Sequence, residues 1–264
     1  MDILRKSLAP ITSEAWEEIN DQAKQTFKNI LTARKFVDID GPKGLTYSAV
    51  PLGRLTLKEQ KEEEGVNYGI NKVLPLIEIR KPFHLDLWEL DNASRGAEDV
   101  DLEPLEVAAR EFAKFEDQAV FYGFHESGIH GLKESSGFDA SQFPESPKDL
   151  LKTLGKVITE FQNKAIEGPY SLIVSPEQWH FILSQIEGYP LINQIKNLLG
   201  GSVYQNPNVK EAFVVSQRGG DFRMTVGQDI SIGFDLATTK EVKLYFTESF
   251  TFQVLEPNAV ALLV

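Results

Sequence analysis

The sequence predicts an α+β fold with a projecting helix and arm, and three patterns support this. One helical stripe runs through residues 104–122, alternating helices and short strands fill 134–225, and residues 222–263 are rich in strand-like alternation. The last strands should pair with a strand near residue 85, because the block between them is self-contained. We therefore expect a discontinuous domain that carries an inserted α/β domain.

Composition and charge exclude several classes of protein. The chain has 264 residues, of which 42% are hydrophobic and 25% charged, so wholesale disorder is excluded. It has no cysteine, which excludes disulfide frameworks, thiolate metal sites and cysteine nucleophiles. The net charge of −12 argues against nucleic acid as a partner. No segment has the pattern of a signal peptide or a membrane span, so we expect a cytoplasmic protein without membrane contact.

The first 80 residues are predicted to form a helix and a long hairpin. Residues 12–36 carry apolar side chains at helical spacing, and Thr12 or Ser13 can cap the helix. In residues 45–80, two alternating runs flank the charged segment KEQKEEEG, which predicts an extended arm with a solvated tip. Because a two-stranded ribbon is marginally stable alone, we expect another surface to cover the arm.

The central part of the chain begins with a predicted strand at 83–92 and a helix that Pro104 opens and Gly123 ends. Capping residues then divide the inserted block into helices and strands. The predicted elements are a helix from Ser146-Pro147, a strand at 170–174, a helix from Ser175-Pro176, a helix at about 190–199 that stops at Gly200, and strands at 203–205 and 211–216.

Catalytic signatures are absent from the sequence. His125, Glu126 and His130 form HESGIH, in which the second histidine comes one residue later than in the HExxH motif of zinc proteases. Gly128 also makes this segment loop-like, so we expect ordinary surface histidines and no metal site. Motifs for a nucleophile elbow, a P-loop or a dinucleotide are missing. The residues alone favour an assembly protein over an enzyme.

Nine segments, in order, resemble the encapsulins, the shell proteins of nanocompartments, also known as the linocin-like bacteriocin family. The segments are LRKSLAPIT, ARKFVDIDGP, LPLIEIRKPFHLDLWELDN, FEDQAVFYG, SPKDLL, IEGPYSLIVSPEQW, VVSQRGGDF, GQDISIGF and TESFTFQVLEP. The resemblance implies the Hong Kong 97-type phage capsid fold. Its parts would be an N-arm helix (1–44), an E-loop (45–80), a P-domain (81–133 and 226–264) and an A-domain (134–225).

The resemblance also implies a function. Members of the family self-assemble into closed icosahedral shells, and the smallest such shell needs about 60 copies. They enclose cargo enzymes that carry a C-terminal targeting peptide, typically a ferritin-like iron-storage protein or a dye-decolourising peroxidase linked to oxidative stress. The shell protein itself is not an enzyme. We therefore expect the partners of this chain to be further copies of itself and one such bacterial cargo protein.

Three sites follow from the resemblance. The groove for the cargo peptide would be formed by Phe27, Ile30, Leu31, Arg34 and Asp38, with Ile230 and Ile232 opposite. Arg34 would pair with an acidic group or a carbonyl of the peptide, and the alternative for the apolar members is packing within the chain. The fivefold pore would be lined by Glu187, Gly188, Tyr189 and Pro190, an exposed corner between two helices.

The third site is for a flavin such as FMN. Trp88 would stack on the isoalloxazine ring and Arg80 would meet the phosphate, whereas the alternative makes Trp88 a partly buried strand residue. No cofactor is required for shell formation. Two other functions stay open at this point. A phage or prophage major capsid protein would share the fold but package DNA, and older family names imply a bacteriocin or a protease.

Overall fold

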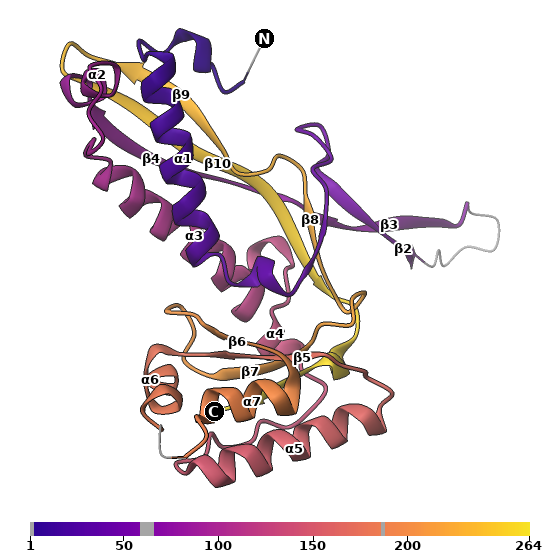
Figure 1. Ribbon diagram of the computed structural model, residues 1–264. Helices are drawn as coiled ribbons and strands as arrows, with labels where there is room; N and C mark the ends of the chain where they lie inside the picture. Colours follow the sequence, from indigo (N-terminus) through magenta and orange to yellow (C-terminus); the bar gives the residue numbers. More distant parts are fainter. Residues whose placement is uncertain (1–2, 59–65, 186–187) are drawn as a thin grey trace.

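The computed structural model describes residues 3–58, 66–185 and 188–264. It has an elongated upper layer, a lower α/β layer and a two-stranded arm that projects sideways (Figure 1). The helices are α1 (Ser13–Ile30), α2 (Leu87–Ser94), α3 (Glu103–Tyr122), α4 (Leu132–Ser135), α5 (Pro147–Asn163), α6 (Pro176–Ser184) and α7 (Leu191–Leu199). Among these helices of the described ranges, none is both long enough and apolar enough to cross a membrane.

The upper layer is built on one long strand. The sheet has the order β1 (Asp38–Asp40), β8 (Phe222–Val226), β10 (Glu241–Val254) and β4 (Ile77–Asp86), and β9 (Ser231–Ala237) also pairs with β10. Strand β4 runs antiparallel to β10 along ten residue pairs. The predicted pairing between the end of the chain and a strand near residue 85 is therefore confirmed for β10.

Helices α1 and α3 cover this sheet and enclose an aromatic cluster. The ring of Phe246, on β10, lies 4.8 Å from Phe83, 4.9 Å from Phe27 and 5.9 Å from Phe112 between ring centroids. All four side chains are buried. Because Phe27 comes from α1, Phe112 from α3 and the other two from neighbouring strands, the cluster joins the helices to the sheet.

The lower layer is a second sheet with its own helices. Its order is β11 (Val260–Leu263), β7 (Ala212–Ser216), β5 (Tyr170–Val174) and β6 (Gly200–Gln205). The predicted caps are confirmed, because Ser146 and Ser175 accept backbone N–H bonds at the start of α5 and α6. The predicted stop of α7 is confirmed too, since Gly200 adopts a left-handed φ of 72°.

Three sequence predictions about the elements are wrong. The last strand, β11, does not join the strand near residue 85, because a short turn at Pro257–Ala259 redirects the chain and β11 pairs with β7. The strand predicted at 83–92 ends at Asp86, whose carboxylate accepts two backbone N–H bonds and so caps α2.

The third wrong prediction is the helix over 12–36. Helix α1 ends at Ile30, where Leu31 leaves helical geometry with a ψ of 96°. The backbone N–H of Ala33 then donates to Asp117 of α3 instead of to the preceding turn. A short 3₁₀ turn over Ala33–Lys35 follows and carries Arg34.

The arm consists of β2 (Ala49–Lys58) and β3 (Tyr68–Pro75), which pair antiparallel as the sequence predicts. The charged tip at 59–65 lies outside the described residues. Several large apolar side chains of the arm are exposed in the single chain, including Leu57, at 74%, and Ile70, at 56%. Exposed apolar surface on a projecting ribbon is typical of a segment that contacts another chain.

Phe246→Ala should lower the free energy of unfolding by about 3–5 kcal/mol, because it leaves a cavity among three aromatic rings. Leu198→Ala on α7, where the side chain is 40% exposed, is the control and should cost less than about 1 kcal/mol. Denaturant titration followed by circular dichroism measures both. Equal losses in the two variants would contradict the central position of Phe246.

Candidate functional site

A half-open groove lies between α1 and the start of β9. It has a volume of about 320 Å³, and Phe246 of β10 contributes to its floor. Its lining residues are Lys6, Asn20, Ala23, Lys24, Phe27, Leu31, Arg34, Asp229, Ile230, Ser231, Ile232 and Phe246. Half of these residues are apolar and half are polar, and the polar ones include Lys6, Lys24 and Arg34. This composition suits an elongated ligand that carries both apolar and polar groups.

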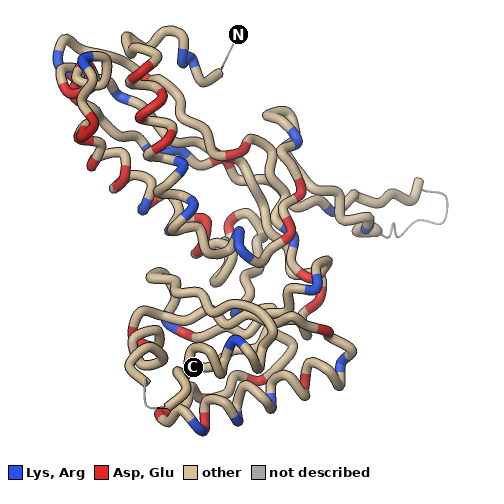
Figure 2. The backbone as a smooth tube through the Cα atoms, viewed as in Figure 1, with Lys and Arg blue, Asp and Glu red and all other residues tan. Residues whose placement is uncertain are grey.

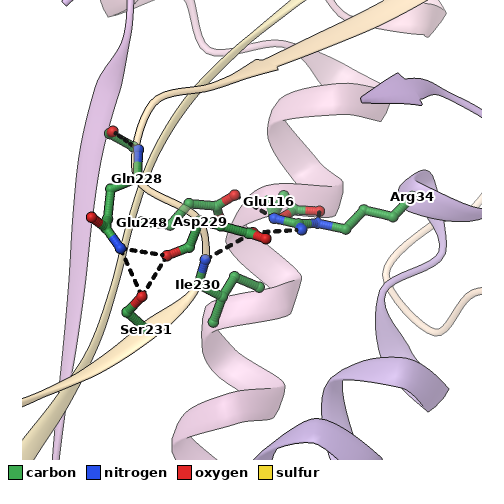
Figure 3. Close-up of polar contacts among 8 residues, drawn as sticks. Arg34, Glu116, Gln228, Asp229, Ile230, Ser231 and Glu248 are labelled. Carbon is green, nitrogen blue, oxygen red and sulfur yellow. Dashed lines mark hydrogen bonds and ion pairs between the residues drawn. The ribbon is translucent and has the colours of Figure 1, made fainter. Parts of the chain in front are cut away.

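Arg34 closes one end of the groove and binds three carboxylates (Figure 3). Its Nε and Nη2 donate to both oxygens of Glu116 at 2.8–3.1 Å, and Nη1 donates to Asp229 Oδ1 at 2.9 Å. Nη2 also donates to Glu248 Oε1. The side chains of Glu116 and Glu248 are fully buried. One guanidinium therefore joins the turn after α1 to α3, to β10 and to the start of β9.

The cluster sets one cation against three carboxyl groups. Burial opposes the charge of Arg34, but Glu116 and Glu248 outweigh burial and raise the pKa of the guanidinium. Burial raises the pKa of Glu248 well above its ordinary value, and the Glu116 carboxylate raises it further. Among the described residues, Glu248 Oε2 has no hydrogen-bond partner. The Glu248 carboxyl therefore resists ionisation, and Arg34 opposes that effect.

Asp229 connects Arg34 to the wall of the groove. Its Oδ1 accepts from the backbone N–H of Ile230 at 2.8 Å as well as from Arg34. The Ser231 hydroxyl donates to the Asp229 carbonyl at 2.8 Å and accepts from Gln228 Nε2 at 2.7 Å (Figure 3). These bonds fix the turn that presents Ile230, so the groove is shaped before any ligand arrives.

Asp117, next to Glu116 in α3, is a third buried carboxyl. It accepts from the backbone N–H of Ala33 at 3.0 Å and from Asn206 Nδ2 at 2.9 Å. Burial raises the pKa of Asp117 to about 7, and the neighbouring Glu116 contributes in the same direction. This side chain therefore ties the turn after α1 to α3 and also to the lower layer.

The structure brings together five of the residues that the sequence analysis assigned to the groove. Phe27, Leu31, Arg34, Ile230 and Ile232 all line it.

The other two residues lie elsewhere. Ile30 packs beside the buried cluster of the upper layer, and Asp38 on β1 accepts a hydrogen bond from the backbone of Gly220. Sequence reasoning missed the acidic partners of Arg34. The charged Glu248 within the apolar run of β10 was the available signal, because a buried charge requires a partner.

The predicted pore corner is described only in part. Glu187 lies outside the described residues, and Gly188 has a left-handed φ of 73°. Tyr189 is exposed and accepts a bond from Gln194 Nε2 at its carbonyl, at 2.6 Å. Pro190 directly precedes α7. The corner is thus presented at the start of α7, and its position around a pore stays a prediction.

The two residues predicted to hold a flavin lie apart. Trp88 is on α2, not on a strand, and is 71% exposed, with the Arg95 guanidinium 6.0 Å from its ring centroid. Arg80 on β4 binds Glu78 at 2.8 Å and lies 5.1 Å from the ring centroid of Tyr245. Trp88 and Arg80 line different hollows. Among the described residues, Trp88 and Arg80 therefore do not form one site, and flavin binding stays a prediction.

Two solved structures with a similar architecture are a virus-like particle and a phage capsid. A virus-like particle from Pyrococcus furiosus matches with a TM-score of 0.66 at 18% identity, covering 95% of this chain and 98% of that chain. The capsid of Myoviridae phage XM1 matches with a TM-score of 0.54 at 14% identity, covering 88% and 91%. At these identities the likeness concerns the fold, and it defines the chain as a protein with the Hong Kong 97-type capsid fold.

Sequence comparison gives the family. The family described as "Encapsulating protein for peroxidase" matches residues 1–251. A type 1 encapsulin shell protein of Rhodospirillum rubrum is 39% identical, over 98% of this chain and 95% of its own length. One of Rhodococcus erythropolis is 34% identical, over 98% of both chains. The chain belongs to the encapsulin family, as the sequence analysis predicted.

Membership in this family settles the general role of the chain. It is a shell protein that forms a capsid-like cage, and its role is structural, not enzymatic. The reading as a protease is therefore wrong. The phage capsids support the shared fold alone. Acidic and basic residues interleave along α3 and α5 in Figure 2, so neither helix forms a basic stripe of the kind that nucleic acid binds.

Asp117→Asn should flatten the dependence of stability on pH. The Asp117 carboxyl ionises near 3.8 in the unfolded chain and near 7 in the folded chain, so unfolding releases a proton between these values. The stability that Asp117 contributes is therefore complete below about pH 4 and lost as the pH rises through 7, by up to about 4 kcal/mol. Denaturant titrations at half-unit pH steps measure this difference between wild type and variant.

The control is Asp149→Asn. Asp149 is exposed, and bonds from Ser146 and Lys152 lower its pKa, so its contribution has the opposite sign and is lost as the pH falls. Parallel pH curves for wild type and Asp117→Asn would contradict the raised pKa.

Proposed function

We propose that the groove between α1 and β9 binds the C-terminal targeting peptide of a cargo enzyme inside a closed shell of about 60 copies. The observation that carries the proposal is the preformed hollow, in which the apolar side chains of Phe27, Phe246, Ile230 and Ile232 lie among polar ones. An extended peptide can place alternate apolar side chains there. The exposed apolar arm supports contacts between neighbouring copies of the chain.

Binding at one groove should be weak. A short peptide buries a few hundred Å² of apolar surface, worth several kcal/mol at about 25 cal/mol per Å² before the cost of ordering. A micromolar dissociation constant for a single peptide follows. An oligomeric cargo presents several peptides to several grooves, and the high effective concentration then retains it inside the shell.

Arg34 has a positioning role in this proposal. Its donors already bind Glu116, Asp229 and Glu248, so a charged group of the peptide would instead meet Lys6 or Lys24. Replacing Arg34 would leave the buried carboxylates without their partner and destabilise the fold. A loss of cargo could then reflect either poor folding or weaker peptide binding. Ile230 is a better test position, because it lines the groove and is partly exposed.

The cargo we propose is a dye-decolourising peroxidase or a ferritin-like iron-storage protein. The family description names peroxidase as the enclosed partner, which supports the first. In the same proposal the shell is a cytoplasmic compartment, and its fivefold pore is formed by the corner that includes Gly188, Tyr189 and Pro190. An FMN stacked on Trp88 would be an addition to the shell and is not needed to form it.

Ile230→Asp should reduce the amount of cargo per shell at least fivefold, because it places a carboxylate in the apolar wall. Shells are purified from the native host with the substitution at the chromosomal locus, and mass spectrometry gives the ratio of co-purified protein to shell protein. Only intact particles, checked by electron microscopy, are compared.

The matched control is Leu236→Asp, which adds the same charge to an exposed apolar position farther along β9, outside the groove. Its cargo ratio should equal that of wild type. Undiminished cargo in Ile230→Asp shells would show that the peptide binds elsewhere.

A further inference from the structure

Three side chains with metal-ligating atoms meet just beyond the C-terminal end of α3, outside the groove. They are His125, His130 and Glu134, and one ligand atom of each lies within 4.8 Å of the others. The segment forms the link from α3 to α4, which lies between the upper and lower layers in Figure 1. We propose that these three residues bind a divalent transition-metal ion of the zinc class.

The backbone of this link is built to hold the two histidines on one side. Phe124 and Ile129 form an antiparallel bridge, with N–H to carbonyl bonds of 2.9 and 3.1 Å in the two directions. Gly128 turns the chain with a left-handed φ of 77°. Because the bridge is antiparallel, residue 125 leads into the turn and residue 130 leads out of it, so the bridge and the turn together determine how near the two side chains lie. The rings of His125 and His130 have centroids 6.0 Å apart.

Glu134 is fixed in place by the backbone as well. Its Oε1 accepts from the N–H of Gly131 at 3.0 Å. The chain also passes close beneath the carboxylate at Gly123, where a Cβ atom would lie 2.9 Å from Oε1. A glycine at position 123 therefore leaves the room that this carboxylate occupies. Leu132, fully buried, anchors the first turn of α4.

The distances suit a metal ion. His130 Nδ1 lies 3.1 Å from Glu134 Oε1, and His125 Nε2 lies 3.7 Å from Glu134 Oε2. Ligands about 2.1 Å from a tetrahedral ion lie about 3.4 Å from each other, so small side-chain movements complete the site. Both histidine side chains are about 70% exposed, which leaves the remaining coordination position to water.

The ligand set selects the class of ion. Two imidazoles and one carboxylate suit Zn²⁺, Ni²⁺, Co²⁺ or Cu²⁺, whereas Mg²⁺ and Ca²⁺ prefer oxygen ligands alone. The neighbouring Lys133 does not repel the ion strongly, because it is paired with Glu211 at 2.6 Å. The alternative is an ordinary histidine–carboxylate contact without metal.

A second histidine–carboxylate pair in the chain serves as a matched control for a contact that binds no metal. His84 Nδ1 lies 3.1 Å from Glu241 Oε1, the same distance as in the His130–Glu134 pair, and both side chains are about half exposed. This pair lacks a second imidazole. The cluster of His125, His130 and Glu134 should therefore bind Zn²⁺, whereas the pair of His84 and Glu241 should not.

The test is zinc binding by intact shells of the full chain, stripped with a chelator and titrated with ZnCl₂ in equilibrium dialysis. Wild type should bind one ion per chain with a micromolar dissociation constant. His125→Ala and His130→Ala should each weaken binding at least tenfold, and the double variant should lose the site. Glu134→Gln keeps an oxygen for Gly131 and should also weaken binding at least tenfold. His84→Ala should bind as wild type does.

Co²⁺ provides a second measurement that reports on coordination. Its visible absorption should gain intensity on binding to wild-type shells and lose that gain in His130→Ala. Unchanged zinc affinity in the double variant would overturn the proposal. An equal loss in His84→Ala would do the same, because it would assign binding to scattered surface histidines.

Discussion

The buried guanidinium of Arg34 is the interaction on which the groove depends. One side chain compensates two fully buried carboxyls, on α3 and β10, and also holds Asp229 at the start of β9. Removing one partner of such a cluster leaves an uncompensated buried charge, which costs about 3–5 kcal/mol. The wall of the groove therefore keeps its place only while the turn after α1, the central helix and the sheet stay joined.

Different parts of the chain would bind the cargo peptide and contact neighbouring subunits. The groove is lined within one chain, by residues of α1, β9 and β10 and of the turns that adjoin α1 and β9. The arm, in contrast, exposes large apolar side chains that the rest of its own chain leaves uncovered. Peptide binding can thus be preformed in each subunit, whereas the arm becomes covered only as neighbouring subunits assemble.

The sequence predicted elements where a local signal sets them. Caps at Ser146 and Ser175 and the stop at Gly200 were correct because each depends on a few adjacent residues. The pairing of β11 and the end of α1 were predicted wrongly, because both depend on residues that are distant in the sequence. The closeness of Glu134 to His125 and His130 was not predicted for the same reason, because only the folded link brings these three side chains together.

Hydrogen–deuterium exchange on intact shells tests the central claim most directly. Arg34→Met keeps the volume of the side chain but removes its five donors, and Arg80→Met, at an exposed arginine, is the control. The account predicts at least tenfold faster amide exchange in two segments at once, residues 28–36 and 227–233, with no change in the control. Faster exchange confined to 28–36 would contradict it, because the guanidinium would then not hold the wall of the groove.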